Sequence, residues 1–160
     1  MENEHKQQVA MATEVGKLLP ETKEKVHFYS EVIEAEKILI KQFEKRANSF
    51  FASKIQKAKD RIEIIKIKSG LIQKEKLYAN YLERKERYEK WLDEMAIEVE
   101  NTFDEIVERA KQIPNPRLQD GINKFLSLVD SNTLQDKVEF FLFVKQEIMN
   151  HEKYGKRKSK

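Results

Sequence analysis

The 160-residue sequence contains no cysteine, four glycines and three prolines. Without cysteine the chain can form neither a disulfide nor a thiolate metal site, and it has no thiol nucleophile. Glycine and proline mark turns, so their scarcity disfavours a fold of many short strands. Charged residues make up 37% of the chain and hydrophobic residues 39%, which is typical of long, solvent-exposed helices. We therefore predict an all-α protein.

Long hydrophobic runs are also missing from the sequence. The longest uninterrupted apolar run, residues 140–144, has five members, whereas a membrane-spanning helix needs about 20. The first residues are polar and of mixed charge, and no hydrophobic segment typical of a signal peptide follows them. We therefore expect a soluble, cytoplasmic protein with no membrane partner.

The residue patterns of common catalytic sites are absent as well. The chain has three histidines and no His-Glu-x-x-His, glycine-rich phosphate loop or Gly-x-Ser-x-Gly pattern. Glu24 and His27 form a single Glu-x-x-His pair, whereas a helical di-metal site takes such a pair from each of two helices. We therefore expect no enzyme activity, no cofactor, no metal and no small-molecule substrate.

Apolar residues recur every three or four positions from residue 21 to residue 113. The first set is Val26, Tyr29, Ile33, Ile40, Phe43, Ala47, Phe51, Ile55, Ala58, Ile62 and Ile65, and the second is Leu71, Tyr78, Tyr81, Tyr88, Leu92, Met95, Val99, Phe103, Ile106, Ala110 and Ile113. The first set, continued in phase beyond Ile65, meets mostly polar positions, so the two sets are out of register. The break predicts a long antiparallel, coiled-coil-like hairpin over 20–113 with its turn near 69–70. A continuous helix through Gly70 is the alternative.

Prolines divide the remainder of the chain. Pro20 predicts the end of an N-terminal helix over 2–19, because proline is favoured at the first position of a helix. Asn115 and Pro116 predict the start of a C-terminal helical pair over 116–152, with Asn115 as N-cap. These helices would form a small head on the hairpin, within a single all-helical domain over 1–155. Residues 154–160 would form a basic tail.

Charge is distributed unevenly along the chain. Residues 1–40 carry a net charge of −3, residues 41–90 a net charge of +8, and residues 91–110 a net charge of −6. Within the basic segment, Lys54, Lys57, Arg61 and Lys68 lie at helical spacing, one step from the apolar positions. We predict that these four residues form a basic binding stripe near the turn, suited to phosphates or to an acidic protein surface.

The last helix is apolar on much of its circumference. Phe140, Phe143 and Val144 widen the face formed by its other hydrophobic residues, and they are our candidates for self-association. We predict a non-enzymatic interaction or assembly protein, structural or adaptor in role, which forms homo-oligomers or binds protein partners through coiled-coil contacts. The alternative is a nucleic-acid-associated helical protein that uses residues 41–90 and the basic tail.

Overall fold

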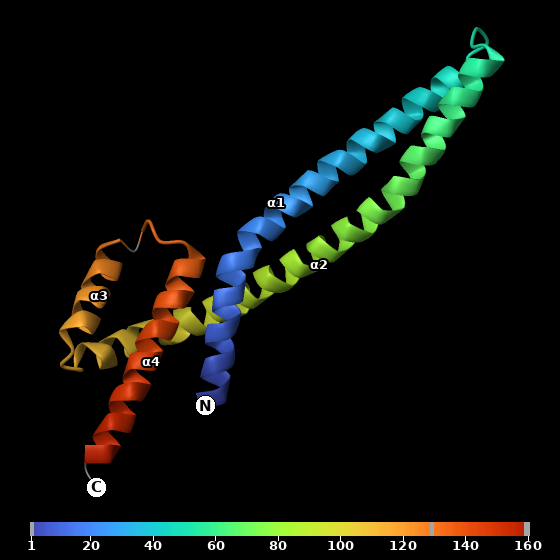
Figure 1. The fold of residues 1–160 in the computed structure, drawn as a ribbon. Helices are drawn as coiled ribbons and strands as arrows, with labels where there is room; N and C mark the ends of the chain where they lie inside the picture. Colours follow the sequence, from blue (N-terminus) through green and yellow to red (C-terminus); the bar gives the residue numbers. More distant parts are fainter. Residues whose placement is uncertain (1, 129, 159–160) are drawn as a thin grey trace. The chain divides into compact units, whose positions relative to one another are not determined.

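The computed structural model describes residues 2–128 and 130–158, which form four helices and no strand. They are α1 (Glu2–Ala47), α2 (Lys54–Lys111), α3 (Pro116–Ser127) and α4 (Leu134–Lys158) (Figure 1). The predicted all-α class is confirmed. The chain divides into two compact units, which we call unit 1 (Met1–Leu18 and Tyr88–Lys160) and unit 2 (Leu19–Arg87). Helices α1 and α2 contribute to both, and the predicted single domain over 1–155 stays a prediction.

Unit 2 is the predicted antiparallel hairpin, and its two arms are parts of α1 and α2 joined by residues 48–53 (Figure 1). Its core consists of large apolar side chains from both arms: Ile33, Ile40 and Leu71, with Tyr29, Ile64, Ile67 and Tyr78 packed against them. The rings of Tyr29 and Tyr81 also stack across the two arms, with centroids 5.8 Å apart. Burial of this single seam holds the two arms together.

Charged pairs accompany the apolar seam of unit 2. Lys74 donates a hydrogen bond to the carboxylate of Glu36 within the interface. Lys37 Nζ lies 3.3 Å from a carboxylate oxygen of Glu75 at its edge. Polar residues inside a helical seam favour one register, because a shifted register would separate the charges. These pairs therefore favour the observed alignment of the arms.

The predicted turn at 69–70 is wrong. Gly70 lies in the interior of α2, and the chain reverses at 48–53 instead. The error arises because α2 has two apolar faces: Ile64, Ile67 and Leu71 face α1, whereas Ile62 and Ile65 are exposed. Residues two apart on a helix point about 200° away from each other. The predicted seam followed the exposed face as far as Ile65 and the buried face from Leu71, so a change of face resembled a change of register.

The actual turn is built without glycine or proline. Helix α1 ends at Ala47, and the Ser49 N–H donates to the carbonyl oxygen of Arg46 over 3.1 Å. Helix α2 then begins directly after Ser53, whose hydroxyl accepts a hydrogen bond from the Gln56 N–H over 3.1 Å. Serine followed by glutamine three residues later is a helix-capping pattern. This pattern was the sequence signal for the true turn.

Two further predicted helix boundaries are wrong. Helix α1 continues through Pro20, although proline supplies no N–H for the hydrogen bond to the preceding turn. Leu19 and Thr22, on either side of Pro20, are both buried, and their packing favours the continuous helix. Helix α4 extends to Lys158, beyond the predicted end at residue 152 and into the predicted tail, because Lys and Arg are good helix formers and favour a helix C-terminus. Residues 159–160 of that tail lie outside the described part of the chain.

Unit 1 is a helical bundle that contains the predicted head helices together with the last part of α2. Its buried core draws on every one of its helical segments: Ala12, Val15, Tyr88, Leu92, Met95, Val99, Ile106, Val107, Ala110, Leu118, Ile122, Val138, Phe141, Leu142, Val144 and Ile148. Helix α4 runs antiparallel to the start of α1, with Gln135 Nε2 2.9 Å from the carbonyl oxygen of Ala12 and Lys153 Nζ 2.8 Å from Glu2.

The corner between α2 and α3 is capped from both sides. Asn115 Oδ1 accepts hydrogen bonds from the N–H groups of Arg117 (3.1 Å) and Leu118 (3.3 Å), which confirms Asn115 as the N-cap and Pro116 as the first helical residue. Gln119 Nε2 lies within 3.2 Å of the carbonyl oxygens of Ala110, Lys111 and Ile113. The same corner thus satisfies the free ends of both helices.

We predict that Gly70→Ala stabilises the protein. No described glycine has a positive φ, and a Cβ at residue 70 would meet nothing within 4 Å, so alanine fits the helix without strain. Alanine is favoured over glycine in a helix interior by about 0.5–1 kcal/mol. Urea denaturation followed by circular dichroism should therefore show a higher free energy of unfolding. A lower value would instead indicate a turn at this position.

Candidate interaction surfaces

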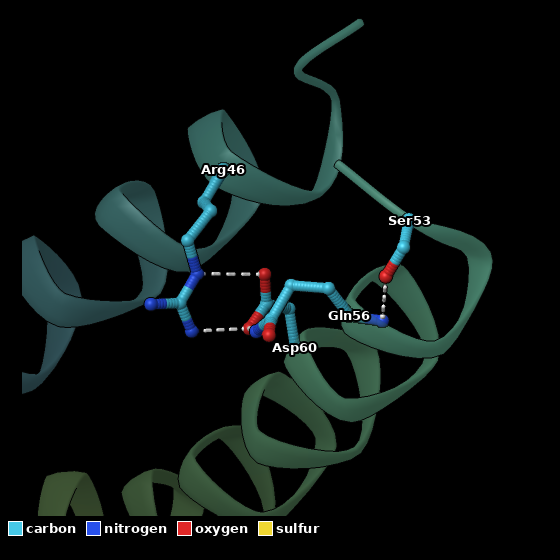
Figure 2. A network of polar contacts seen from close by, with 4 residues as sticks. All are labelled: Arg46, Ser53, Gln56 and Asp60. Carbon is cyan, nitrogen blue, oxygen red and sulfur yellow. Dashed lines mark hydrogen bonds and ion pairs between the residues drawn. The ribbon is translucent and has the colours of Figure 1, made fainter. Parts of the chain in front are cut away.

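The turn of unit 2 is braced by a buried carboxylate. Asp60, on α2, is only 1% exposed and receives two hydrogen bonds from the guanidinium of Arg46, on α1. The bond from Arg46 Nε to Asp60 Oδ2 measures 2.9 Å (Figure 2). Gln56 Nε2 adds a third bond of 2.9 Å to Oδ1. A paired guanidinium and carboxylate is among the strongest side-chain interactions in proteins. It ties the end of α1 to the beginning of α2.

This contact keeps both groups ionised. Hydrogen bonding from Arg46 lowers the pKa of Asp60 below its ordinary value, although burial acts in the opposite direction. The same hydrogen bond raises the pKa of Arg46. A lowered carboxylate pKa means that the folded protein binds the proton of Asp60 less readily than the unfolded chain does. The brace is therefore a charged interaction at neutral pH.

The braced turn presents two aromatic side chains to solvent. Phe50 is 92% exposed and Phe51 is 93% exposed, and their rings meet edge to face with centroids 5.6 Å apart. Phe51 had been predicted to lie in the hairpin seam, and this prediction is wrong because the chain reverses at this point. Two adjacent, almost fully exposed phenylalanines form an apolar feature of the kind that marks interaction sites.

Three of the four predicted basic residues surround this turn. Lys54, Lys57 and Arg61 lie in the first two turns of α2, directly after residues 48–53. Lys68 lies two helical turns further along and pairs with Glu44 at 3.6 Å, so it belongs to the hairpin arms. Residues 45–61 contain six Lys or Arg and a single acid, the buried Asp60. We call Phe50, Phe51 and the basic residues of 45–61 the aromatic-basic turn.

Helix α2 also carries an exposed apolar stripe that begins beside this turn. Its members are isoleucines that are each more than half exposed: Ile55, Ile62, Ile65 and Ile72. They lie about half a circumference away from the buried Leu71 and the partly buried Ile64 and Ile67. The isoleucine stripe is therefore a second apolar face of α2, which α1 does not cover.

The three residues predicted for self-association lie in different environments within unit 1. Val144 is buried in the core and cannot reach a partner in this fold. Phe140 is half-buried, and its ring stacks on that of Phe125 with centroids 3.9 Å apart. Phe143 is exposed at a hollow of about 330 Å³ that Val9 also lines. Of the three candidates, Phe143 alone presents an exposed side chain.

An apolar hollow of about 340 Å³ lies between α2, α3 and α4 of unit 1. Its walls are Ala96, Val99, Phe103, Phe125 and Leu134, and its charged lining residues are Glu100, Asp104 and Lys137. Asp93, Glu94 and Glu108 are also exposed on this part of α2, as is Ile97. We call this hollow with its charged lining the acidic hollow. Neither the sequence nor the predicted seam indicated it, because its walls come from three separate helices.

A second, more polar hollow of about 310 Å³ lies between α1, α2 and α4 in unit 1. Buried His5 lines it with Arg109, Glu152, Lys145 and Glu98. Two ion pairs cross it, Arg109 to Glu152 at 2.6 Å and Lys145 to Glu98 at 3.2 Å. Neither ring nitrogen of His5 hydrogen bonds to a described residue. Glu4 also lines the hollow, and the other four charged lining residues pair with one another, so we interpret this hollow as part of the packing of unit 1.

Comparisons with known proteins found no relative of the chain. No protein-family model matches the chain, and neither a curated protein nor a solved structure is significantly similar to it. Over residues 2–128 and 130–158, no helix has a stretch long and apolar enough to cross a membrane. Within the same residues, His, Asp and Glu side chains form no group of three that could hold a metal ion. The exposed surfaces of the described residues therefore provide the basis for a proposed function.

We predict that Asp60→Asn lowers the thermal stability of the protein at pH 7. The substitution keeps the shape of the side chain but removes the charge that Arg46 binds. The stabilising effect of Asp60 is complete above the ordinary aspartate pKa of about 3.9 and is lost as the pH falls through its lowered folded value. The gap between the melting temperatures of wild type and variant should therefore narrow below about pH 4.

The matched control for this prediction is Asp120→Asn, at an exposed aspartate on α3. It should leave the melting temperature nearly unchanged at neutral pH. Melting curves followed by circular dichroism from neutral to acidic pH provide the comparison. A constant gap between wild type and Asp60→Asn over the whole range would show that the charge of Asp60 contributes nothing.

Proposed function

We propose that this chain is a non-enzymatic helical assembly protein, which associates with further copies of itself through unit 2. The observation that carries the proposal is the isoleucine stripe on α2. Four large aliphatic side chains on one helical face, each more than half exposed, have the spacing of an unoccupied helix-packing surface. Coiled-coil contacts with a helix of another copy would remove them from water.

The charges of the two units support self-association. Unit 2 contains seventeen Lys and Arg against eleven acids, a net charge of +6, whereas unit 1 contains fourteen against seventeen, a net charge of −3. Opposite charges on the two units favour contact between unit 2 of one copy and unit 1 of another. Contact between two copies of unit 2 would instead bring like charges together. The proposed homo-oligomer therefore uses two different surfaces of each copy.

We predict that replacing Ile62 and Ile65 with glutamine weakens self-association. Both side chains are exposed, so the substitutions should leave the fold intact, and glutamine is a good helix former. Losing their burial at a helix interface should cost about 2 kcal/mol, or roughly thirtyfold in the association constant. Light scattering coupled to size exclusion, over a range of protein concentrations, measures the change.

The matched variant is Phe143→Gln, which removes the exposed candidate on α4. An unchanged mass for Phe143→Gln beside a reduced mass for the isoleucine variant would favour unit 2 as the assembly surface. A reduced mass for Phe143→Gln beside an unchanged mass for the isoleucine variant would indicate that α4 provides the assembly surface. A wild-type protein that remains monomeric at every concentration would contradict the proposed function.

Nucleic-acid binding is the second candidate function, favoured by the aromatic-basic turn. Lysine and arginine neutralise phosphates, and exposed aromatic rings stack on unpaired bases. Lys54, Lys57 and Arg61 adjoin Phe50 and Phe51, and this combination suits a single strand. The net charge of +3 for the whole chain is low for such a role, so we rank it second.

This second candidate makes its own prediction. Retention of single-stranded DNA or RNA should weaken steeply with salt, and reversing Lys54, Lys57 and Arg61 to glutamate should reduce the slope of log K against log salt by about 2. Reversing Lys6, Lys17 and Lys124, which are exposed in unit 1, is the control. Filter binding at several salt concentrations tests it. Retention that ignores salt, or none at low salt, would exclude this function.

A further inference from the structure

The two exposed phenylalanines are the most apolar feature of the aromatic-basic turn. A phenylalanine that becomes buried removes roughly 150–250 Å² of surface from water, more than an aliphatic side chain does. Phe50 and Phe51 also occupy a short turn between two helices, held by the bonds of Arg46 and Gln56 to Asp60. They are therefore presented in a defined arrangement, and little chain entropy would be lost when they enter a pocket.

The acidic hollow in unit 1 has the size and walls to receive such a ring. A cavity of about 150 Å³ lined by aliphatic and aromatic side chains is large enough for benzene. The acidic hollow measures about 340 Å³, so it can hold a phenylalanine side chain with room for part of a second. The rings of Phe103 and Phe125, with centroids 6.0 Å apart, provide aromatic walls for edge-to-face or offset stacking.

Charge distinguishes this hollow from the two other hollows described above for unit 1. Glu100 and Asp104 line it, further acids continue along α2, and Lys137 is its one basic lining residue. The hollow beside Phe143 has Glu139 as its one charged lining residue, and the polar hollow already contains paired charges. Arg46 is paired with Asp60, and the five other basic residues over 45–61 complement the acids beside the acidic hollow. Complementary charges steer two surfaces together and disfavour alternative pairings.

We propose that the Phe50–Phe51 turn of one copy docks into the acidic hollow of a second copy, with Lys54 and Lys57 facing Glu100 and Asp104. This inference rests on the proposed function, self-assembly, and identifies both contacting surfaces. The contact is heterologous, because each copy offers a turn and a hollow that differ from each other. Repetition of such a contact generates a ring or an open chain of copies.

A membrane surface and a nucleic acid would each use the basic residues and the phenylalanines, but neither explains an apolar hollow lined by acids in the same chain. The second copy accounts for both features. We therefore treat the other two partners as outcomes of the test.

The experiment uses three versions of the full chain. The turn variant carries Phe50→Ser and Phe51→Ser, and the hollow variant carries Glu100→Lys and Asp104→Lys. All four residues have exposed or lining side chains, and circular dichroism checks that each variant folds. Light scattering over a range of concentrations should show assembly of the wild type, and association about 100-fold weaker for either variant alone.

Mixing the two variants gives the decisive measurement. The turn variant keeps an intact hollow and the hollow variant keeps an intact turn, so the mixture should form a one-to-one heterodimer that grows no further. A symmetric interface, or docking within one chain, cannot produce this result. Formation of the heterodimer supports the proposal, and two monomeric variants that stay monomeric when mixed overturn it.

The remaining outcomes separate this inference from the proposed function. If the wild type assembles and the turn variant assembles equally well, the inference fails while self-assembly stands. If the wild type is monomeric at all concentrations, both fail. If the wild type is monomeric but sediments with vesicles of phosphatidylcholine and phosphatidylserine, or binds single-stranded DNA, the turn variant is tested in the same assay. Loss of this binding in the turn variant would show that the turn binds a membrane or a nucleic acid.

Discussion

A helix in a two-helix hairpin has one neighbour, so it can bury one apolar face and no more. This constraint governs unit 2. Helix α2 carries two apolar faces, and the one with Ile64, Ile67 and Leu71 is covered by α1. The other, with Ile55 and Ile62, remains in water. In unit 1 the same helix has several neighbours, and its apolar side chains are mostly buried there. The contrast between the units follows from the number of neighbours rather than from composition.

The turn must then be held by something other than a large core. Only two arms meet there, so little apolar area is available, and the chain uses the Arg46–Asp60 pair instead. Burying a carboxylate is costly unless its oxygens are hydrogen-bonded, and Gln56 supplies a further donor. With the polar groups directed inward in this way, Phe50 and Phe51 are left outside. The usual arrangement, with aromatic residues inside and charged residues outside, is reversed at this turn.

Much of the fold could be predicted from the sequence, and the misplaced turn has a single physical origin. The predicted apolar seam positions from Val26 to Ala47 and from Leu71 to Ile113 are all buried or half-buried, and Asn115 caps α3 as predicted, because these features depend on local spacing. The turn was misplaced because a helix with two apolar faces permits two seams, and periodicity cannot say which one has a neighbour. The acidic hollow could not be foreseen, since α2, α3 and α4 contribute its walls from distant parts of the chain. The helix-capping pattern of Ser53 and Gln56 would have predicted the start of α2, and therefore the turn, at its observed position.

The exposed surfaces also differ in what they can recognise. An isoleucine stripe alone would pack against almost any apolar helix, because dispersion and burial have little directional preference. A pair of phenylalanines beside clustered positive charge is more selective. Its partner must offer an apolar pocket for the rings and acidic residues beside that pocket, at the same spacing as the phenylalanines and the basic residues of the turn. The stripe begins on α2 directly after the turn, so one contact can engage both. Affinity would then come largely from apolar area, while the choice of partner and the geometry of assembly would be set by the braced turn.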